Sequence, residues 1–518
     1  MNFQKETQDL GFSDPPKKIG IISFTDPRKE VKFVKEREDF IKKTQNQIIT
    51  FLEKNNFIVI NPHLDIINQL DKKEIFGINK LEEIVLAKNH FIKEDICSLI
   101  IGCFTWNEPD LPLELAKKLD VPIALVTTTN SNWPGITALT STGASFWQSS
   151  YNYYIKNHER FSFVPDSTKQ QMIPWIAATC AIKHLQEGKI LLWGGTPALH
   201  MEHLNDDIPL LKRFLINDII TEDQFILVKK AEEILEKSEF RIKNFLNWLK
   251  KNNCKIEYDN KMLDEGILEK QIAFYLAAKD IIKNYHQNKE RIIGTSVKCQ
   301  PELSVDYGVT PCLIPAFLPF PEDNEGKKPI IPTVCEGDIK GLLTSSLLFG
   351  LNHKIPPLFG DLKVLTEKYF IIANCGAASA FYAGNSNDPK NSLSRSIISA
   401  QCQGESGGAF GYHTPKTEDL ATYARLIRID SEYILQYGLG KIIDLTDTKE
   451  HAWGTTWPHT AVQLNVPMEL FIKAIGSNHL SLTYGNYEKE LDYIAKLLSI
   501  TKMRFDNEIS IEAFLDNY

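Results

Sequence analysis

Residues 98–128 decide the fold class, with SLIIGCF (98–104), PLELAKKL (112–119) and PIALVTT (122–128) following one another. The first and third stretches are apolar runs typical of buried strands, and the second has the spacing of an amphipathic helix. The same alternation begins upstream with IGIISF (19–24) and IVINP (58–62). Strands that alternate with helices predict an α/β domain, a parallel sheet covered on both faces, whose ligands lie beyond the carboxyl ends of the strands.

A second α/β unit follows a loop predicted at VPDSTKQQ (164–171), with strands expected at KILLWGG (189–195) and RIIGTSVKC (291–299). Residues 222–252 and 263–287 are expected to form long amphipathic helices. The turn after KILLWGG lacks GxGxxG, so it does not predict a nucleotide site.

From about residue 355 the pattern changes to short apolar runs separated by Gly and polar turns, which predicts a β-rich, barrel-like domain. The sequence therefore predicts two parallel-sheet α/β domains followed by this β-rich domain. The expected divisions are an arm at 1–17 and domains at 18–168, 169–354 and 355–518.

Composition narrows the class of protein. The chain has 518 residues and a formal net charge of −8, which gives no electrostatic reason to expect nucleic acid or a membrane as a partner. Its nine cysteines include no CxxC pair, which favours a reducing compartment over a disulfide scaffold. No apolar segment resembles a signal peptide or a membrane helix. We therefore expect a cytoplasmic protein.

Three side chains are candidates for a metal centre: Glu336 in CEGDIKGLLT, Asp361 in LFGDLKV and His479 in GSNHLSLTYGN. Two carboxylates and an imidazole suit a divalent ion that keeps open positions for a substrate. Their separation along the chain leaves an alternative, in which Glu336 is a helix N-terminal acid, Asp361 a turn residue and His479 a surface imidazole.

Several segments resemble the L-fucose isomerase and L-arabinose isomerase-like superfamily. They are KCQPEL (298–303), CEGDIKGLLT (335–344), LFGDLKV (358–364), NCGAASAFY (374–382), WPHTAVQL (457–464) and GSNHLSLTYGN (476–486), with weaker likeness in NSNWPGITALT (130–140) and WGGTPALHM (193–201). The aspartate in the second site position is more similar to the fucose type. The resemblance implies a ketol isomerase that moves a proton between C1 and C2 of a free monosaccharide, L-fucose-like or D-arabinose-like, through a metal-stabilised enediolate.

The same resemblance implies roles for individual residues. Glu336, Asp361 and His479 would bind Mn²⁺, or another divalent cation such as Mg²⁺ or Co²⁺, and the two carboxylates would also act as acid and base. Asn478 and Gln300 would contact the sugar, and a homo-oligomer, a trimer or hexamer, is implied.

Other residues near the predicted ligand-binding edge are candidates for contact with a substrate. Arg28 is the best candidate for a basic substrate-loop residue. Trp106 and Trp133 lie in predicted loops where they would stack on a sugar or pack at a subunit contact. His200 and His203 are spaced i, i+3, which permits a metal pair but favours a surface or substrate-loop role.

Two other functions remain open. One keeps the fold and changes the sugar, to L-arabinose or to an anionic sugar such as the sulfonated hexose sulfoquinovose, for which Arg28 or His200 would supply positive charge. The other is a non-catalytic sugar-binding protein, which would bind without turnover and without metal.

Overall fold

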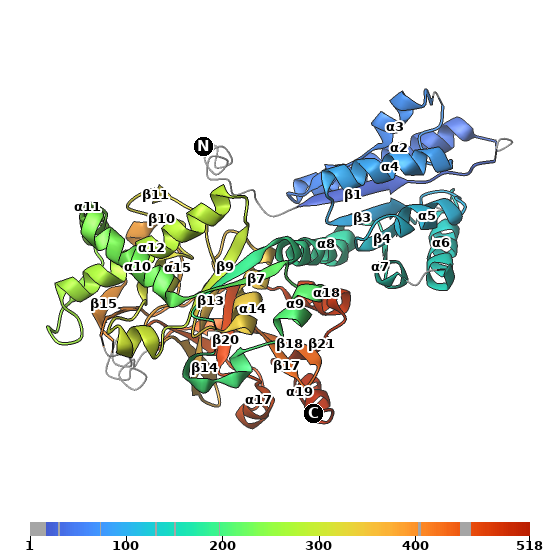
Figure 1. Ribbon diagram of the computed structural model, residues 1–518. Helices are drawn as coiled ribbons and strands as arrows, with labels where there is room; N and C mark the ends of the chain where they lie inside the picture. The colour runs from blue at the N-terminus through green and yellow to red at the C-terminus, as the bar shows by residue number, and fades with distance from the viewer. Residues whose placement is uncertain are drawn as a thin grey trace. The chain divides into compact units, whose positions relative to one another are not determined.

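The computed structural model describes residues 17–28, 32–72, 74–129, 132–149, 152–195, 197–401, 406–445 and 457–518. These residues form two compact units, Pro15–Lys183 and His184–Tyr518, here called the N-terminal and C-terminal units. Both are visible in Figure 1, and each is described by itself. In the described parts of the chain, no helix has the length and apolar character needed to cross a membrane.

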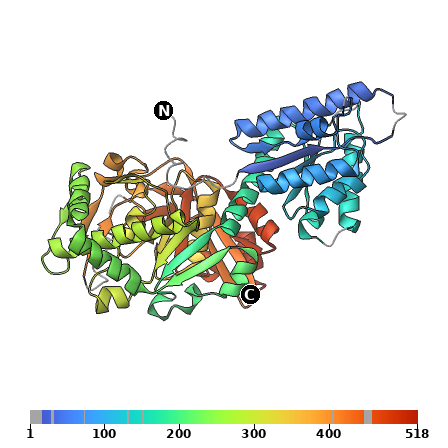
Figure 2. The same cartoon turned by 45° about the horizontal axis from the view of Figure 1, so that its top comes forward.

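The N-terminal unit is built on a five-stranded parallel sheet in the order β2-β1-β3-β4-β5. Its strands are β1 (Lys18–Ser23), β2 (Ile58–Ile60), β3 (Ser98–Gly102), β4 (Ile123–Thr127) and β5 (Glu159–Ser162). Strand β3 is buried along its whole length, because both faces of the sheet are covered by helices (Figure 2). The helices are α2 (Val34–Lys54), α3 (His63–Gln69), α4 (Leu81–Glu94), α5 (Asp110–Lys117), α6 (Gly135–Ser149), α7 (Tyr153–Lys156) and α8 (Pro165–Glu187).

Helix α8 differs from the sequence expectation. The predicted loop at 164–171 is mostly helical, because α8 begins at Pro165, where proline is tolerated in a first turn. The expected domain division at 168 and 169 therefore falls inside this helix. The two compact units divide at Lys183 and His184, and residues 184–354 and 355–518 lie in one unit.

The first layer of the C-terminal unit is a four-stranded parallel sheet in the order β12-β9-β6-β7. Its strands are β6 (Lys189–Trp193), β7 (Asp218–Glu222), β9 (Ile292–Val297) and β12 (Thr333–Cys335). The surrounding helices are η2 (Ala198–His200), η3 (Glu202–Leu204), α9 (Ile208–Phe214), α10 (Gln224–Lys237), α11 (Glu239–Lys251), α12 (Glu265–Gln287), η4 (Glu302–Asp306), α13 (Leu313–Phe317) and α14 (Ile339–Leu351). The single helix predicted over 222–252 is two helices that meet at Ser238.

The second layer is a seven-stranded sheet in the order β17-β20-β13-β14-β19-β18-β21. Strand β17 also pairs with β18, so the first six strands close into a barrel and β21 joins β18 from outside. The strands are β13 (Leu358–Leu365), β14 (Tyr369–Ala373), β17 (Leu420–Ile429), β18 (Glu432–Ile443), β19 (His459–Gln463), β20 (His479–Tyr484) and β21 (Thr501–Arg504). The predicted fold class, parallel-sheet α/β regions with a barrel-like β-rich region, is confirmed.

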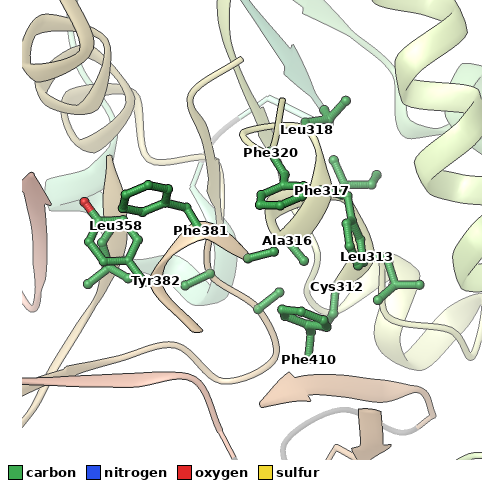
Figure 3. Packing of buried hydrophobic residues seen from close by; sticks show 14 of the residues in the cluster. Cys312, Leu313, Ala316, Phe317, Leu318, Phe320, Leu358, Phe381, Tyr382 and Phe410 are labelled. Carbon is green, nitrogen blue, oxygen red and sulfur yellow. The ribbon is translucent and has the colours of Figure 1, made fainter. Parts of the chain in front are cut away.

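Smaller elements complete the C-terminal unit. They are the sheet of β8 (Lys255–Glu257), β15 (Ile397–Ala400) and β16 (Gly408–Gly411), the hairpin of β10 (Glu322–Asp323) and β11 (Gly326–Lys327), and helices α15 (Phe381–Gly384), α16 (Pro389–Leu393), α17 (Met468–Ala474), α18 (Glu488–Leu498) and α19 (Glu508–Leu515). Figure 3 shows how α13 packs into the core, with Phe317 beside Phe410 at a ring-centroid distance of 5.1 Å. In the same core the Tyr382 hydroxyl lies 3.0 Å from the carbonyl of Pro356 and 3.1 Å from that of Leu482, near β13 and β20, and its one hydrogen bonds to these acceptors. This packing joins the sheets into one continuous hydrophobic core.

Candidate active site

Glu336 lies in the tight connection between a parallel strand and a helix. Strand β12 ends at Cys335 and α14 begins at Ile339, so Glu336 is at the carboxyl end of the sheet, where α/β proteins bind ligands. Glu336 and Gly337 both have left-handed backbones, with φ of 65° and 69°. The connection is fixed by Asp338, whose carboxylate accepts from the Gly341 amide at 2.8 Å and caps α14.

Asp361 and His479 are cross-strand neighbours in the barrel. Strands β13 and β20 are antiparallel, and their register pairs Asp361 directly with His479. Residues that face each other in this way project from the same side of a sheet. Asp361 is therefore a strand residue, and His479 is a buried one, so the turn and surface alternatives for these two residues are wrong.

The three predicted ligands meet at the His479 imidazole. Its Nε2 atom is 3.0 Å from Glu336 Oε2 and 3.4 Å from Asp361 Oδ1. The side chains of His479 and Glu336 are buried, whereas that of Asp361 is 37% exposed. Asp361 is thus the member of this trio that an incoming molecule can reach.

Asp338 contacts the His479 ring nitrogen that does not face Glu336 or Asp361. It is fully buried, and its Oδ2 atom is 2.8 Å from His479 Nδ1 while the carboxylate also accepts from both terminal nitrogens of Arg425. Burial opposes ionisation of Asp338, but Arg425 and His479 outweigh it and hold the pKa of Asp338 well below its usual range. Because ionised Asp338 can only accept, His479 Nδ1 carries the hydrogen.

This arrangement leaves two buried atoms in need of a positive charge. His479 Nε2 and Glu336 Oε2 face each other, and neither has a hydrogen-bond partner among the described residues. With Nδ1 protonated, a neutral imidazole would present a lone pair to a carboxylate oxygen, so a proton or a metal ion belongs between them. Burial alone would lower the pKa of His479, but the hydrogen bond to Asp338, the contact with Glu336 and the charge of Asp361 raise it well above its ordinary value.

The donor set fits a small divalent ion in composition, and two of its distances are compatible with neighbouring ligands. Ligands at right angles around an ion with bonds of about 2.1 Å lie about 3 Å apart, close to the two distances measured from His479 Nε2. Nevertheless, within the described residues no group of three or more His, Cys, Asp and Glu side chains is placed as a complete metal site. The three donors contact each other in pairs through His479, and binding an ion would require them to spread around it. The predicted ligand roles therefore stay predictions.

Asn478 lies at the accessible rim of the trio. Its Nδ2 atom donates to Asp361 Oδ1 at 2.7 Å, and its Oδ1 atom is 2.9 Å from His203 Nε2. Burial and the nearby Glu336 carboxylate raise the pKa of Asp361, against the opposing effect of His479. A carboxyl group with a raised pKa exchanges protons more readily near neutral pH, as acid–base chemistry requires.

Gln300 lines a cavity of about 20 Å³ that it shares with Cys299, Cys312, Cys335 and Cys375. That volume accommodates one water but no sugar. These four thiols are free, and burial contributes to a raised pKa at each of them, which makes them poor nucleophiles. The structure does not bring Gln300 into a described contact with the trio.

Arg28, Trp106 and Trp133 all belong to the N-terminal unit. Arg28 forms a bidentate ion pair with Asp26, with Nε 2.8 Å from Oδ1, and so its charge is already balanced. Trp133 stacks on Phe40 of α2 at 6.0 Å, and Trp106 is partly buried. Their predicted contacts with a sugar stay predictions.

Sequence reasoning missed Asp338 and Arg425 as parts of the site. Asp338 lies inside the quoted CEGDIKGLLT, and Arg425 interrupts an apolar strand, TYARLIRID (422–430). An arginine in a buried strand signals a buried acidic partner, since an unpaired charge there is strongly unfavourable.

Comparison with known families bears on the second layer of the C-terminal unit. Residues 372–504 match the family described as L-fucose isomerase, C-terminal domain. This segment is therefore similar to L-fucose isomerase C-terminal domains. The match confirms the resemblance to the fucose isomerase type in this part of the chain, and it indicates a sugar isomerase of the aldose–ketose class. No curated protein matches the chain.

The matched segment contains Asn478 and His479, whereas Glu336 and Asp361 precede it. Members of this family are generally metal-dependent. The family match thus covers Asn478 and His479, whereas the measured contacts of the candidate site also include Glu336 and Asp361.

Proposed function

We propose that this chain is a divalent-metal-dependent aldose–ketose isomerase that acts on a free monosaccharide, L-fucose-like or D-arabinose-like. The observation that supports the proposal is the meeting of Glu336 and Asp361 at one His479 imidazole. Glu336, Asp361 and His479 would hold the ion, with Mn²⁺ as the proposed metal. When bound, it would act as a Lewis acid that polarises the sugar carbonyl.

The chain's own residues would handle two protons. Isomerisation requires one group to move the proton between C1 and C2 and another to manage the hydroxyl proton. The half-exposed carboxylate of Asp361 is accessible to the substrate, while Glu336 lies deeper against the buried His479. Asn478 would donate hydrogen bonds from the rim, holding Asp361 and contacting the sugar.

The direct test is aldose-to-ketose conversion by the purified chain with added Mn²⁺ and with a chelator. Chelation should abolish turnover, and Glu336→Gln should lower kcat by at least about 100-fold, because it removes a charged ligand and a proton acceptor. Glu418→Gln, at a site where the side chain is 79% exposed, is the matched control and should behave as the unmodified chain. A fully active Glu336→Gln variant would overturn the mechanism.

A substrate panel separates the alternatives. Neutral pentoses and 6-deoxyhexoses, L-arabinose and a sulfonated hexose should be assayed side by side, and we expect the highest kcat/KM with the neutral L-fucose-like or D-arabinose-like sugars. Turnover of the sulfonated sugar alone would assign the enzyme to an anionic substrate. Binding without turnover, measured by calorimetry with and without Mn²⁺, would identify a non-catalytic sugar-binding protein.

A further inference from the structure

The contacts of Asp361 show how its carboxylate is oriented. Among the described residues, both of its polar side-chain contacts go to Oδ1, from Asn478 Nδ2 at 2.7 Å and His479 Nε2 at 3.4 Å. The side chain is nevertheless 37% exposed, so Oδ2 is the oxygen that remains for a substrate. A side chain that fixes the position of Oδ1 therefore also fixes the direction in which Oδ2 points.

The Asn478 amide can hold Oδ1 only in one orientation. A carboxylate accepts hydrogen bonds, so the amide must present its nitrogen to Asp361 and its oxygen to the other side. That oxygen is 2.9 Å from His203 Nε2. Because an amide oxygen only accepts, His203 Nε2 must carry a hydrogen, and the bonds run in one direction from His203 through Asn478 to Asp361.

His203 is held in place by the short segment Ala198–Leu204. The Ala198 amide donates to the Glu336 carbonyl at 3.0 Å, and Leu204 is fully buried. The Met201 sulfur is 4.0 Å from Asn478 Nδ2, and Lys340 Nζ donates to the carbonyl of Asn205 just beyond the segment. These contacts tie the segment to the peptide of Glu336 and to the Asn478 amide, so an exposed histidine is positioned with respect to the buried trio.

We infer that His203 is a positioning residue of the isomerase: its imidazole locks the Asn478 amide, which in turn aims the Asp361 carboxylate. The inference rests on the proposed function. It assigns to His203 a role through two other side chains, with no contact to the reacting atoms. Supporting residues of this kind change metal affinity or activity by about 10–100-fold when removed.

The test compares three variants of the full-length chain. His203→Leu removes the donor, His203→Gln replaces it with an amide N–H, and Glu202→Leu alters the neighbouring exposed residue on the same turn as the matched control. For each variant we would measure kcat and KM with the best aldose of the panel, and the affinity for Mn²⁺ alone by calorimetry.

We expect His203→Leu to lower kcat about 10–100-fold with a smaller change in KM, and to weaken Mn²⁺ binding about 10-fold. The reason is that the Asp361 carboxylate would no longer be held in one orientation. His203→Gln should recover most of both values, and Glu202→Leu should leave both unchanged. Unaltered kinetics and Mn²⁺ affinity in His203→Leu would overturn the inference, and so would a defect that His203→Gln does not relieve. Absence of turnover in the unmodified chain would instead count against the proposed function.

Discussion

Replacement of Asp338 by asparagine tests how much the buried Asp338–Arg425 ion pair contributes to the stability of the fold and to the candidate site. The substitution is nearly isosteric and keeps a good helix cap, so the bond to the Gly341 amide survives. It removes the only charge described as paired with Arg425, a side chain that is 1% exposed. An asparagine oxygen accepts one of the two guanidinium bonds, and its nitrogen then faces the other donor.

The cost follows from this burial. Removing one partner of a buried ion pair destabilises a protein by about 3–5 kcal/mol, because the remaining charge stays uncompensated. We expect the free energy of unfolding, measured by urea titration, to fall by that amount in Asp338→Asn. Asp264→Asn is the matched control, since Asp264 caps α12 through the Ile267 amide at 2.8 Å on an exposed surface, and it should change stability by less than about 0.5 kcal/mol.

A double variant separates charge from packing. Asp338→Asn combined with Arg425→Met leaves no buried charge in this pair and should recover part of the lost stability. Mn²⁺ affinity gives a second measurement, expected to fall about 10–100-fold because Asp338 orients His479. If Asp338→Asn unfolds at the same urea concentration as Asp264→Asn, the buried charge of Arg425 does not depend on Asp338 for compensation, and the reasoning is incorrect.

Two further predictions concern stability. His63 is buried, with Nε2 accepting from the Ser23 amide at 3.0 Å, and burial lowers its pKa to about 3. Between pH 6.5 and 3 the unfolded chain binds a proton that the folded chain excludes, so the free energy of unfolding should fall as pH falls, by about 2 kcal/mol from pH 7 to pH 5. In urea titrations at both pH values His63→Gln should lose that dependence, and an equally steep profile would contradict the prediction. Gly341→Ala should destabilise by about 1–3 kcal/mol, because a Cβ there would lie 2.5 Å from Asp338 Oδ2 and 2.6 Å from Phe359 Cε2. Gly266→Ala, whose Cβ would be 3.6 Å from Asp264 Oδ1, should stabilise by roughly 0.5–1 kcal/mol, and equal thermal midpoints for the two variants would refute the steric argument.

Much of the fold follows from local patterns. Apolar runs such as SLIIGCF and KILLWGG became buried parallel strands, because their neighbours on both faces are helices. The helix predicted over 222–252 was interrupted at Ser238, since the amphipathic spacing on either side does not reveal a change of direction between two packed helices. The closure of the barrel through β17 and β18 depends on pairing between strands, which no single strand's sequence specifies.

For the candidate site too, individual residues could be predicted from the sequence, whereas their proximity could not. Glu336 was suggested by its place between a strand and a helix, and His479 by its place at the head of a strand. Their proximity required the tertiary fold, because 143 positions of sequence carry no distance information by themselves. The role of His203 was hidden for a further reason: Leu199 and His200 adopt left-handed backbones, with φ of 51° and 58°, which side chains of these types rarely signal.

The cross-strand pairing of Asp361 with His479 has a consequence for how this protein can change over time. Sliding one strand by one residue would turn its side chain to the opposite face from its partner's, and sliding by two would carry the two side chains past each other by about 7 Å. Insertions that shift this register are therefore incompatible with the proposed chemistry, whereas the irregularity of β13 between Leu362 and Val364 lies outside the residues that β13 pairs with β20. New sugar preferences should accordingly arise in lineages by remodelling the loops, with the two paired strands inherited unchanged in length.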